Sequence, residues 1–254
     1  MNHPIIALTG RKRSGKTTAA HLIQADPRGH VAFAEPIKKL LLAIDPLVGE
    51  HAEPSHRNDM CLAGEVNRTG LALLEGMSDL LRQQRLGPSV RRRLFDRGTD
   101  MIAILDLVTP ASPDAIRLST LAATVDELDQ LKDESDPRHR EIRRLLQVIG
   151  TEIGRRTISD DLWIQLGLNR VDAALDAGIR PVVITDVRFD NEALAAREVG
   201  ALVVRINRPD LPDADDTHAS EAGVHDELVD IEITNDGHSL SALRDQLAQA
   251  GLLS

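Results

Sequence analysis

The chain has 254 residues, of which 42% are hydrophobic and 28% are charged, enough for one α/β domain that carries a sizeable insertion. The net charge of −10 argues against a broad basic surface for a nucleic-acid polymer, so a small anionic ligand needs a local basic pocket. The single cysteine, Cys61, has no partner for an intrachain disulfide, which fits a reducing cytoplasm. The apolar run 4–9 is too short for a signal peptide, and no run approaches the roughly 18 apolar residues of a membrane span.

The N-terminal part has the pattern of a strand–helix–strand unit. Residues 4–9 (PIIALT) form an apolar run that predicts a buried strand, and 15–25 predicts a helix. A second strand is expected at 30–34, and Pro36 suits the first turn of a helix over 37–44. A helix between two strands indicates a βαβ unit and a parallel sheet.

The middle of the chain, residues 46–140, has a different pattern, because prolines and glycines interrupt it. Helices are expected at 71–86 and about 119–133, whereas 99–108 fits either a helix or a strand. We interpret 46–140 as a mostly helical insertion.

Regular elements resume at residue 141. The predicted helices are 141–150, which ends at Gly150, then 159–178, 191–200 and 239–250. The predicted strands are 181–185, 201–206 and 230–235. About five short strands alternating with helices predict a three-layer α/β domain with a parallel sheet.

Residues 10–17, GRKRSGKT, match the phosphate-binding loop Gly-x-x-x-x-Gly-Lys-Ser/Thr. Glycines let the backbone wrap closely around phosphate oxygens, and the following helix N-terminus adds donors and partial positive charge. Lys16 is expected to reach the β- and γ-phosphates of ATP, and the Thr17 hydroxyl to ligate Mg²⁺. Arg11, Lys12 and Arg13 add local positive charge. The predicted ATP-binding residues are Gly10, Arg11, Lys12, Arg13, Ser14, Gly15, Lys16, Thr17 and Thr18.

A carboxylate at the end of a neighbouring strand is the second part that such a site requires, because it orders the Mg²⁺ ion. The strand PVVIT runs into Asp186, which is therefore the predicted second metal ligand. The alternative is an Asp that only caps the turn after the strand. Asp45 and Asp106 are weaker candidates, because neither follows a clear strand.

Five motifs occur together in one order: GRKRSGKTT at 10–18, FAEPIKKLL at 33–41, LLQVIGTEIGRR at 145–156, DDLW at 160–163 and ITDVRFDNEA at 184–193. Their combination resembles the phage-type deoxynucleoside monophosphate kinases. The similarity covers roughly 4–42 and 143–235. It implies a P-loop NTPase fold like that of nucleoside monophosphate kinases, and the reaction ATP + dNMP ⇌ ADP + dNDP with Mg²⁺ in the host cytoplasm. The chain departs from that family at Thr17, where these kinases often have Asp.

The acceptor monophosphate needs cations of its own, and the resemblance points to Lys38, Arg155 and Arg188. Arg188 also lies just beyond Asp186, at the sheet edge where ligands of α/β folds bind. The polar loop 207–220 is a candidate lid, and Arg208 at its start is a candidate to stabilise the transferring phosphoryl group. The same loop leads into a family-like pattern formed by His218, Ser220 and Glu221.

Two aromatic side chains have two interpretations each. Phe33 and Trp163 either contact the acceptor base or fill the core. The predicted partners are ATP and a deoxynucleoside monophosphate, without a membrane or a nucleic-acid polymer, and a homodimer is left open.

Two other functions compete with the kinase of deoxynucleotides. A more distant similarity to phosphomevalonate kinases, in the loop, in the Pro-x-Lys segment and in the Gly-Thr-x-x-x-Arg segment, favours a P-loop kinase with another small acceptor. A nucleotide-dependent switch with slow hydrolysis is the other alternative. The chain has no Asn-Lys-x-Asp guanine motif, which argues against a GTPase.

Overall fold

The computed structural model describes residues 3–49, 60–83, 90, 92–93, 96–98, 100–101, 115–131, 136–211, 223–237 and 239–253. The chain divides into two compact units. The first comprises Met1–Phe33 and Gly167–Ser254, and the second comprises Ala34–Leu166. The second unit therefore has wider bounds than the insertion 46–140 predicted from the sequence.

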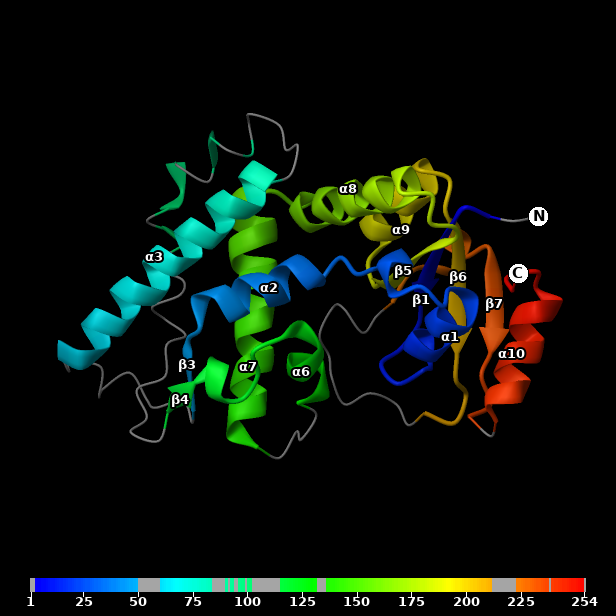
Figure 1. Cartoon of the computed structure of the whole chain (residues 1–254), viewed down its shortest axis with the longest axis horizontal. Coiled ribbons are helices and arrows are strands. Elements are labelled where there is room, and N and C mark those ends of the chain that lie inside the picture. The colour runs from blue at the N-terminus through cyan, green and yellow to red at the C-terminus, as the bar shows by residue number, and fades with distance from the viewer. Residues whose placement is uncertain are drawn as a thin grey trace. The chain divides into compact units, whose positions relative to one another are not determined.

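The first unit is built on a parallel five-stranded sheet, as predicted (Figure 1). The strand order is β2-β5-β1-β6-β7. The strands are β1 (Ile5–Thr9), β2 (His30–Val31), β5 (Val182–Val187), β6 (Leu202–Asn207) and β7 (Ile231–Thr234). β1 lies at the centre with every residue buried, which explains its unbroken apolar sequence. β2 is shorter than the predicted strand 30–34.

Helices cover both faces of this sheet. α1 (Lys16–Ile23) and α10 (Leu240–Gln249) contact each other and share one hydrophobic cluster with Ile6 and Leu8 of β1. α9 (Asp190–Glu198) packs on β6. The β1–α1–β2 and β5–α9–β6 crossovers run in opposite directions across the sheet, so right-handed connections place α1 and α9 on opposite faces. The predicted three-layer α/β fold is thus confirmed.

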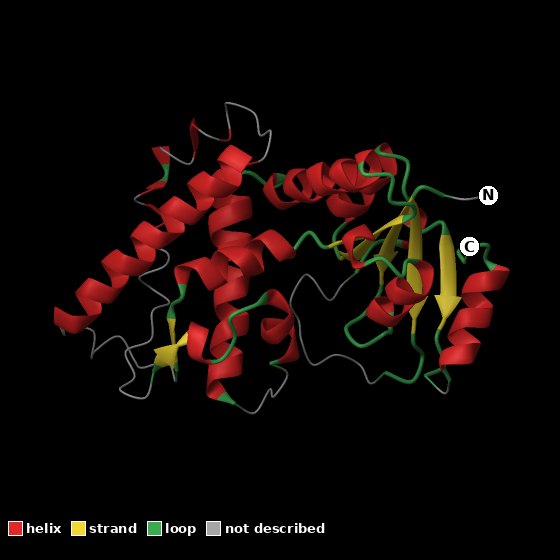
Figure 2. Cartoon of the chain, in the orientation of Figure 1, coloured by secondary structure: helices red, strands yellow, loops and turns green. Residues whose placement is uncertain are grey.

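The second unit is mainly helical among its described residues (Figure 2). Its helices are α2 (Glu35–Ile44), α3 (Met60–Gln83), α6 (Val125–Gln130), α7 (Pro137–Gln147) and the start of α8 (Leu162–Asp176), which continues into the first unit. α2 and α3 pack against each other through Leu40, Leu73 and Met77, all at most 2% exposed. The helix predicted at 119–133 is wrong in its extent, because a 3₁₀ turn at Leu118–Thr120 precedes the shorter α6.

A small antiparallel pair was not predicted. β3 (Leu47–Val48) pairs with β4 (Ile116–Arg117). Each strand has only two residues, too few for a periodic pattern in the sequence.

The predicted end of a helix at Gly150 is also wrong, since α7 runs directly into a π-helical segment, Val148–Ile158. The Trp163 indole N–H donates to the Gly150 carbonyl over 2.7 Å. A Cβ on Gly154 would lie 2.3 Å from Cζ2 of that indole. Gly154 therefore leaves room for the Trp163 indole, and Gly150 accepts its hydrogen bond within the helical segment rather than ending it.

Within the part of the chain that the structure describes, no helix is both long and apolar enough to cross a lipid bilayer.

Candidate nucleotide-binding site

The loop between β1 and α1 has the wrapped backbone that the sequence predicts. Gly15 precedes α1 with φ of 101°, and Arg13 has φ of 65°, both in the left-handed region. The Ser14 N–H donates to the Arg11 carbonyl over 3.2 Å, which closes the turn. The strand–loop–helix context is thereby confirmed, and Lys16 and Thr17 at the N-terminus of α1 line a pocket.

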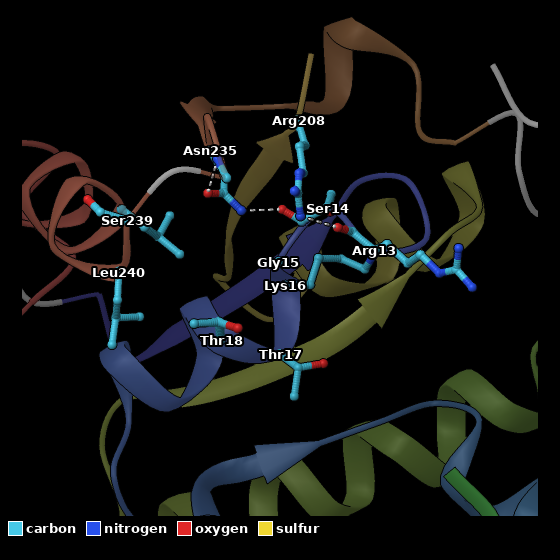
Figure 3. A pocket seen from close by; sticks show the side chains of 12 residues that line it. Arg13, Ser14, Gly15, Lys16, Thr17, Thr18, Arg208, Asn235, Ser239 and Leu240 are labelled. Carbon is cyan, nitrogen blue, oxygen red and sulfur yellow. Dashed lines mark hydrogen bonds between the residues drawn. The ribbon is translucent and has the colours of Figure 1, made fainter. Parts of the chain in front are cut away.

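This loop forms one wall of a pocket of about 470 Å³ (Figure 3). The opposite wall follows β7 and includes the start of α10. The lining residues are Arg13, Ser14, Gly15, Lys16, Thr17, Thr18, Arg208, Asn235, Gly237, Ser239, Leu240 and Leu243. Polar and cationic groups from the loop therefore face a mixed polar and apolar wall, an arrangement suited to a polyphosphate joined to a flat base.

Lys16 is held against the loop itself. Its half-buried ammonium donates to the Gly10 carbonyl over 2.6 Å and to the Arg11 carbonyl over 2.7 Å. Phosphate oxygens carry charge and accept stronger hydrogen bonds than carbonyls do. A polyphosphate in the pocket can therefore draw this ammonium from the loop carbonyls.

Arg208 reaches the same loop from the end of β6. Its Nη1 lies 3.5 Å from the Arg13 carbonyl, and its guanidinium packs against Gly237, where a Cβ would lie 2.5 Å from Nη2. Among the described residues, its buried Nε has no hydrogen-bond partner. Arg208 thus lies beside the predicted phosphate site, and its catalytic role stays a prediction.

A second pocket of about 310 Å³ lies on the other side of the loop and contains four arginines. These are Arg11, Arg188, Arg205 and Arg208. Arg205 forms ion pairs with Asp226 and Glu232, and it donates to the Val224 carbonyl over 2.5 Å. Arg188 is exposed at the carboxyl edge of β5, as its predicted role requires.

Asp186 is the second-last residue of β5, close to the start of the phosphate-binding loop. The register of β1 and β5 pairs Thr9 with Val187, which brings this carboxylate and the loop to the same edge of the sheet. Its Oδ1 accepts a hydrogen bond from the Phe33 backbone N–H over 2.7 Å. The Phe33 side chain is 2% exposed and packs against Gly167, so the structure places this ring in the core.

The other predicted acceptor residues, Lys38, Arg155 and Trp163, belong to the second unit. Lys38 pairs with both carboxylate oxygens of Asp129, at 2.6 and 2.7 Å. Arg155 is half-buried within the π-helical segment. Trp163 is 1% exposed, so its indole is used for packing, which is the second of its two interpretations. The acceptor roles of Lys38 and Arg155 stay predictions.

Part of the predicted site lies outside the described residues. This applies to His218, Ser220 and Glu221, and to the candidate lid 207–220 beyond Leu211. Lys12 is described and exposed, but it lines neither pocket.

The wall formed by Asn235, Gly237, Ser239, Leu240 and Leu243 was not predicted from the sequence. A signal was present, because Asn235 is the last residue of the predicted strand 230–235, and ligands bind at the carboxyl ends of the strands in a parallel sheet. Arg205 of the second pocket lies within β6, close to the start of the candidate lid.

Comparison with known proteins agrees with this geometry. The family model of deoxynucleotide monophosphate kinase matches residues 4–247. The deoxynucleotide monophosphate kinase of Enterobacteria phage T4 is 36% identical over 97 residues, 38% of this chain and 39% of that protein. The protein of the same name from Escherichia phage RB69 is 27% identical over 244 residues, 92% of this chain and 93% of that protein. The deoxynucleoside-5'-monophosphate kinase of Escherichia phage T5 is 30% identical over 108 residues, 40% of this chain and 42% of that protein.

The similarity to the T4 and T5 proteins thus spans less than half of each, but the family model spans nearly the whole chain. The chain belongs to the deoxynucleotide monophosphate kinase family.

Proposed function

We propose that this protein transfers the γ-phosphoryl group of ATP to a deoxynucleoside monophosphate, giving ADP and the deoxynucleoside diphosphate. The observation that carries the proposal is the wrapped loop between β1 and α1, with Lys16 and Arg208 beside one pocket, in a chain matched along 4–247 by this kinase family. Relatives from phages support a role in supplying DNA precursors in the cytoplasm of an infected cell.

Transfer requires two anionic substrates held in line, with the developing charge neutralised. An oxygen of the acceptor phosphate forms the new bond to the γ-phosphorus as the bond from that phosphorus to the ADP oxygen breaks. Lys16 and the loop amides would hold the donor phosphates, and Arg208 would approach them from the opposite side of the loop. Arg188 at the second pocket would bind the acceptor phosphate.

The family implies Mg²⁺, and the oxygen donors at this edge of the sheet suit it. Thr17 is exposed at the start of α1 and lines the first pocket, and Asp186 supplies a carboxylate from the adjacent strand. Among the described residues, no cluster of three or more His, Cys, Asp or Glu side chains forms a site made by the protein alone. Two protein oxygens and the substrate phosphates fit the way in which Mg²⁺ is usually held, and the ion would neutralise phosphate charge there.

Asp186→Asn should lower kcat by about 100-fold or more, because the amide lacks the charge that orders the cation. The fold should persist, since an amide oxygen can still accept from the Phe33 N–H. The measurement is kcat as a function of Mg²⁺ concentration, together with the unfolding temperature. Asp190→Asn is the matched control, because Asp190 is a nearby carboxylate that pairs with His225. If the Asp186→Asn protein turned over at the wild-type rate at every Mg²⁺ concentration, Asp186 would not be a ligand of the metal.

Lys38→Met should raise KM for the deoxynucleoside monophosphate by about tenfold, with KM for ATP unchanged, because one charge-assisted hydrogen bond to the acceptor is lost. Asp129→Asn should lower the same KM, because the Asp129 carboxylate holds Lys38 in the absence of acceptor. Lys39→Met is the control, since Lys39 is the adjacent lysine and pairs with Glu35 over 2.8 Å. An equal effect of the Lys38 and Lys39 variants would contradict an acceptor role for Lys38.

A coupled assay of ADP formation tests the proposed function directly. ATP is supplied with each of the four deoxynucleoside monophosphates in turn, and phosphomevalonate is the competing acceptor. ADP formation that depends on a deoxynucleoside monophosphate is the expected result. ADP at the background rate with all four, or an equal rate without any acceptor, would overturn the proposal.

A further inference from the structure

Asn235 is a buried amide that connects the two walls of the nucleotide pocket. It is 8% exposed and directly follows β7. Its Nδ2 donates to the Ser14 carbonyl over 2.8 Å, and its Oδ1 accepts from the Gly237 N–H over 3.2 Å (Figure 3). Its backbone N–H donates to the Asn207 carbonyl over 2.7 Å, which fixes it to the end of β6. The nitrogen and the oxygen of the same side-chain amide thus each have a hydrogen-bond partner.

The contact with Ser14 sets the orientation of a peptide in the phosphate-binding loop. A trans peptide is planar, so its N–H points away from its carbonyl. Because Asn235 holds the Ser14 carbonyl on its own side, the Gly15 N–H points to the opposite side. Backbone N–H groups just before a helix are the donors that such loops offer to phosphate.

Asn235 also explains why residue 15 is glycine. Gly15 has φ of 101°, and a Cβ there would lie 2.4 Å from Asn235 Nδ2. The side chain of Asn235 therefore occupies the space next to the loop, and the Ser14–Gly15 peptide lies directly against it. A shift of Asn235 would move this peptide or leave its carbonyl without a partner.

The hydrogen bond from Gly237 to Asn235 connects Asn235 to the pocket wall that follows β7. Gly237, which donates to Asn235, packs against the Arg208 guanidinium. Among the described residues, two buried donors beside this network lack partners, namely Ser14 Oγ and Arg208 Nε. Ser14 is 1% exposed. Buried donors without a partner are costly, and a polyphosphate in the pocket would supply acceptors beside them.

We propose that Asn235 is a positioning residue that sets the phosphate-binding loop for ATP by holding the Ser14–Gly15 peptide and the Gly237–Arg208 contact together. The proposal rests on the proposed function in that the loop takes the donor triphosphate. It assigns Asn235 to the binding of the donor and not to the binding of the acceptor.

The test compares Asn235→Asp and Asn235→Ala with the wild type by direct titration of ATP, and of a deoxynucleoside monophosphate in a separate experiment. Asn235→Asp keeps the volume and the acceptor for Gly237, but it faces the Ser14 carbonyl with a second acceptor. Both variants should bind ATP about tenfold or more weakly, because a buried carbonyl loses its donor. Acceptor affinity should stay within twofold. Thr234→Ala is the matched control, since Thr234 is the exposed neighbour on β7 and lines neither pocket.

A pH series separates positioning from a general loss of stability. A protonated carboxyl group has an O–H donor again, so the Asn235→Asp variant should regain ATP affinity relative to the wild type as the pH falls. The Asn235→Ala variant should show no such recovery. ATP affinity within twofold of the wild type in the folded variants would overturn the proposal, and so would equal losses for ATP and acceptor.

If both variants fail to fold, hydrogen exchange on the wild-type protein tests whether Asn235 is coupled to the phosphate-binding loop. ATP should slow exchange in 10–18 and also in 235–237. Protection by ATP that is limited to 10–18 would overturn the proposal that Asn235 positions the loop. The ATP titrations, the pH series and the hydrogen exchange follow ATP binding alone, so they remain valid if the protein phosphorylates an acceptor other than a deoxynucleoside monophosphate.

Discussion

Lys16→Met should reduce kcat by about three orders of magnitude while the unfolding temperature stays close to that of the wild type. The ammonium is the cation at the centre of the loop, and methionine keeps much of its length without its charge. The two loop carbonyls that Lys16 contacts lose a partner, but the side chain is only half-buried, so water can replace it. The measurement is single-turnover phosphoryl transfer, with thermal unfolding in parallel.

Lys39→Met is the control for that experiment. Lys39 is an exposed lysine that pairs with Glu35 over 2.8 Å and lines neither of the two pockets. The Lys39→Met protein should therefore retain most of the wild-type turnover. A Lys16→Met protein that transfers phosphate at the wild-type rate would show that the phosphate-binding role belongs to another residue.

Gly154→Ala should destabilise the second unit by about 3 kcal/mol, because the new methyl group overlaps the Trp163 indole in a core that cannot expand without loss of packing. Both residues are buried, and the indole is also fixed by its bond to Gly150. Trp163 is the single tryptophan of the chain, so its fluorescence during urea unfolding reports on this site.

Gly150→Ala provides the comparison within the same π-helical segment. A Cβ at that position would lie 3.1 Å from Ile37 Cδ1, which is the end of a flexible side chain. The cost should be much smaller than at Gly154. Equal urea concentrations at the midpoint of unfolding for the Gly154→Ala protein and the wild type would mean that the Trp163 indole can move aside.

The central elements were predictable because their local pattern and their final environment agree. β1, β5 and β6 are short, mostly apolar runs that lie inside a parallel sheet, and β7 is an alternating strand at its edge. The loop carries its chemistry within residues 10–17. The π-helical segment was not predictable, because Gly154 accommodates, and Gly150 accepts a hydrogen bond from, an indole that follows them in the chain. The far wall of the pocket depends on Asn235 and Ser14, which are 221 residues apart, and no local pattern records such a contact.

The order of the strands along the chain has a consequence for synthesis on the ribosome. β1 is made first, but both of its neighbours in the sheet, β5 and β6, begin only at Val182 and Leu202. The second unit, Ala34–Leu166, is therefore complete while the strand before the loop still has two open edges. Asn235 emerges later still, so a nascent chain should acquire ATP affinity only after residue 235 has left the ribosome. Until then the unpaired β1 is the segment most in need of protection from aggregation.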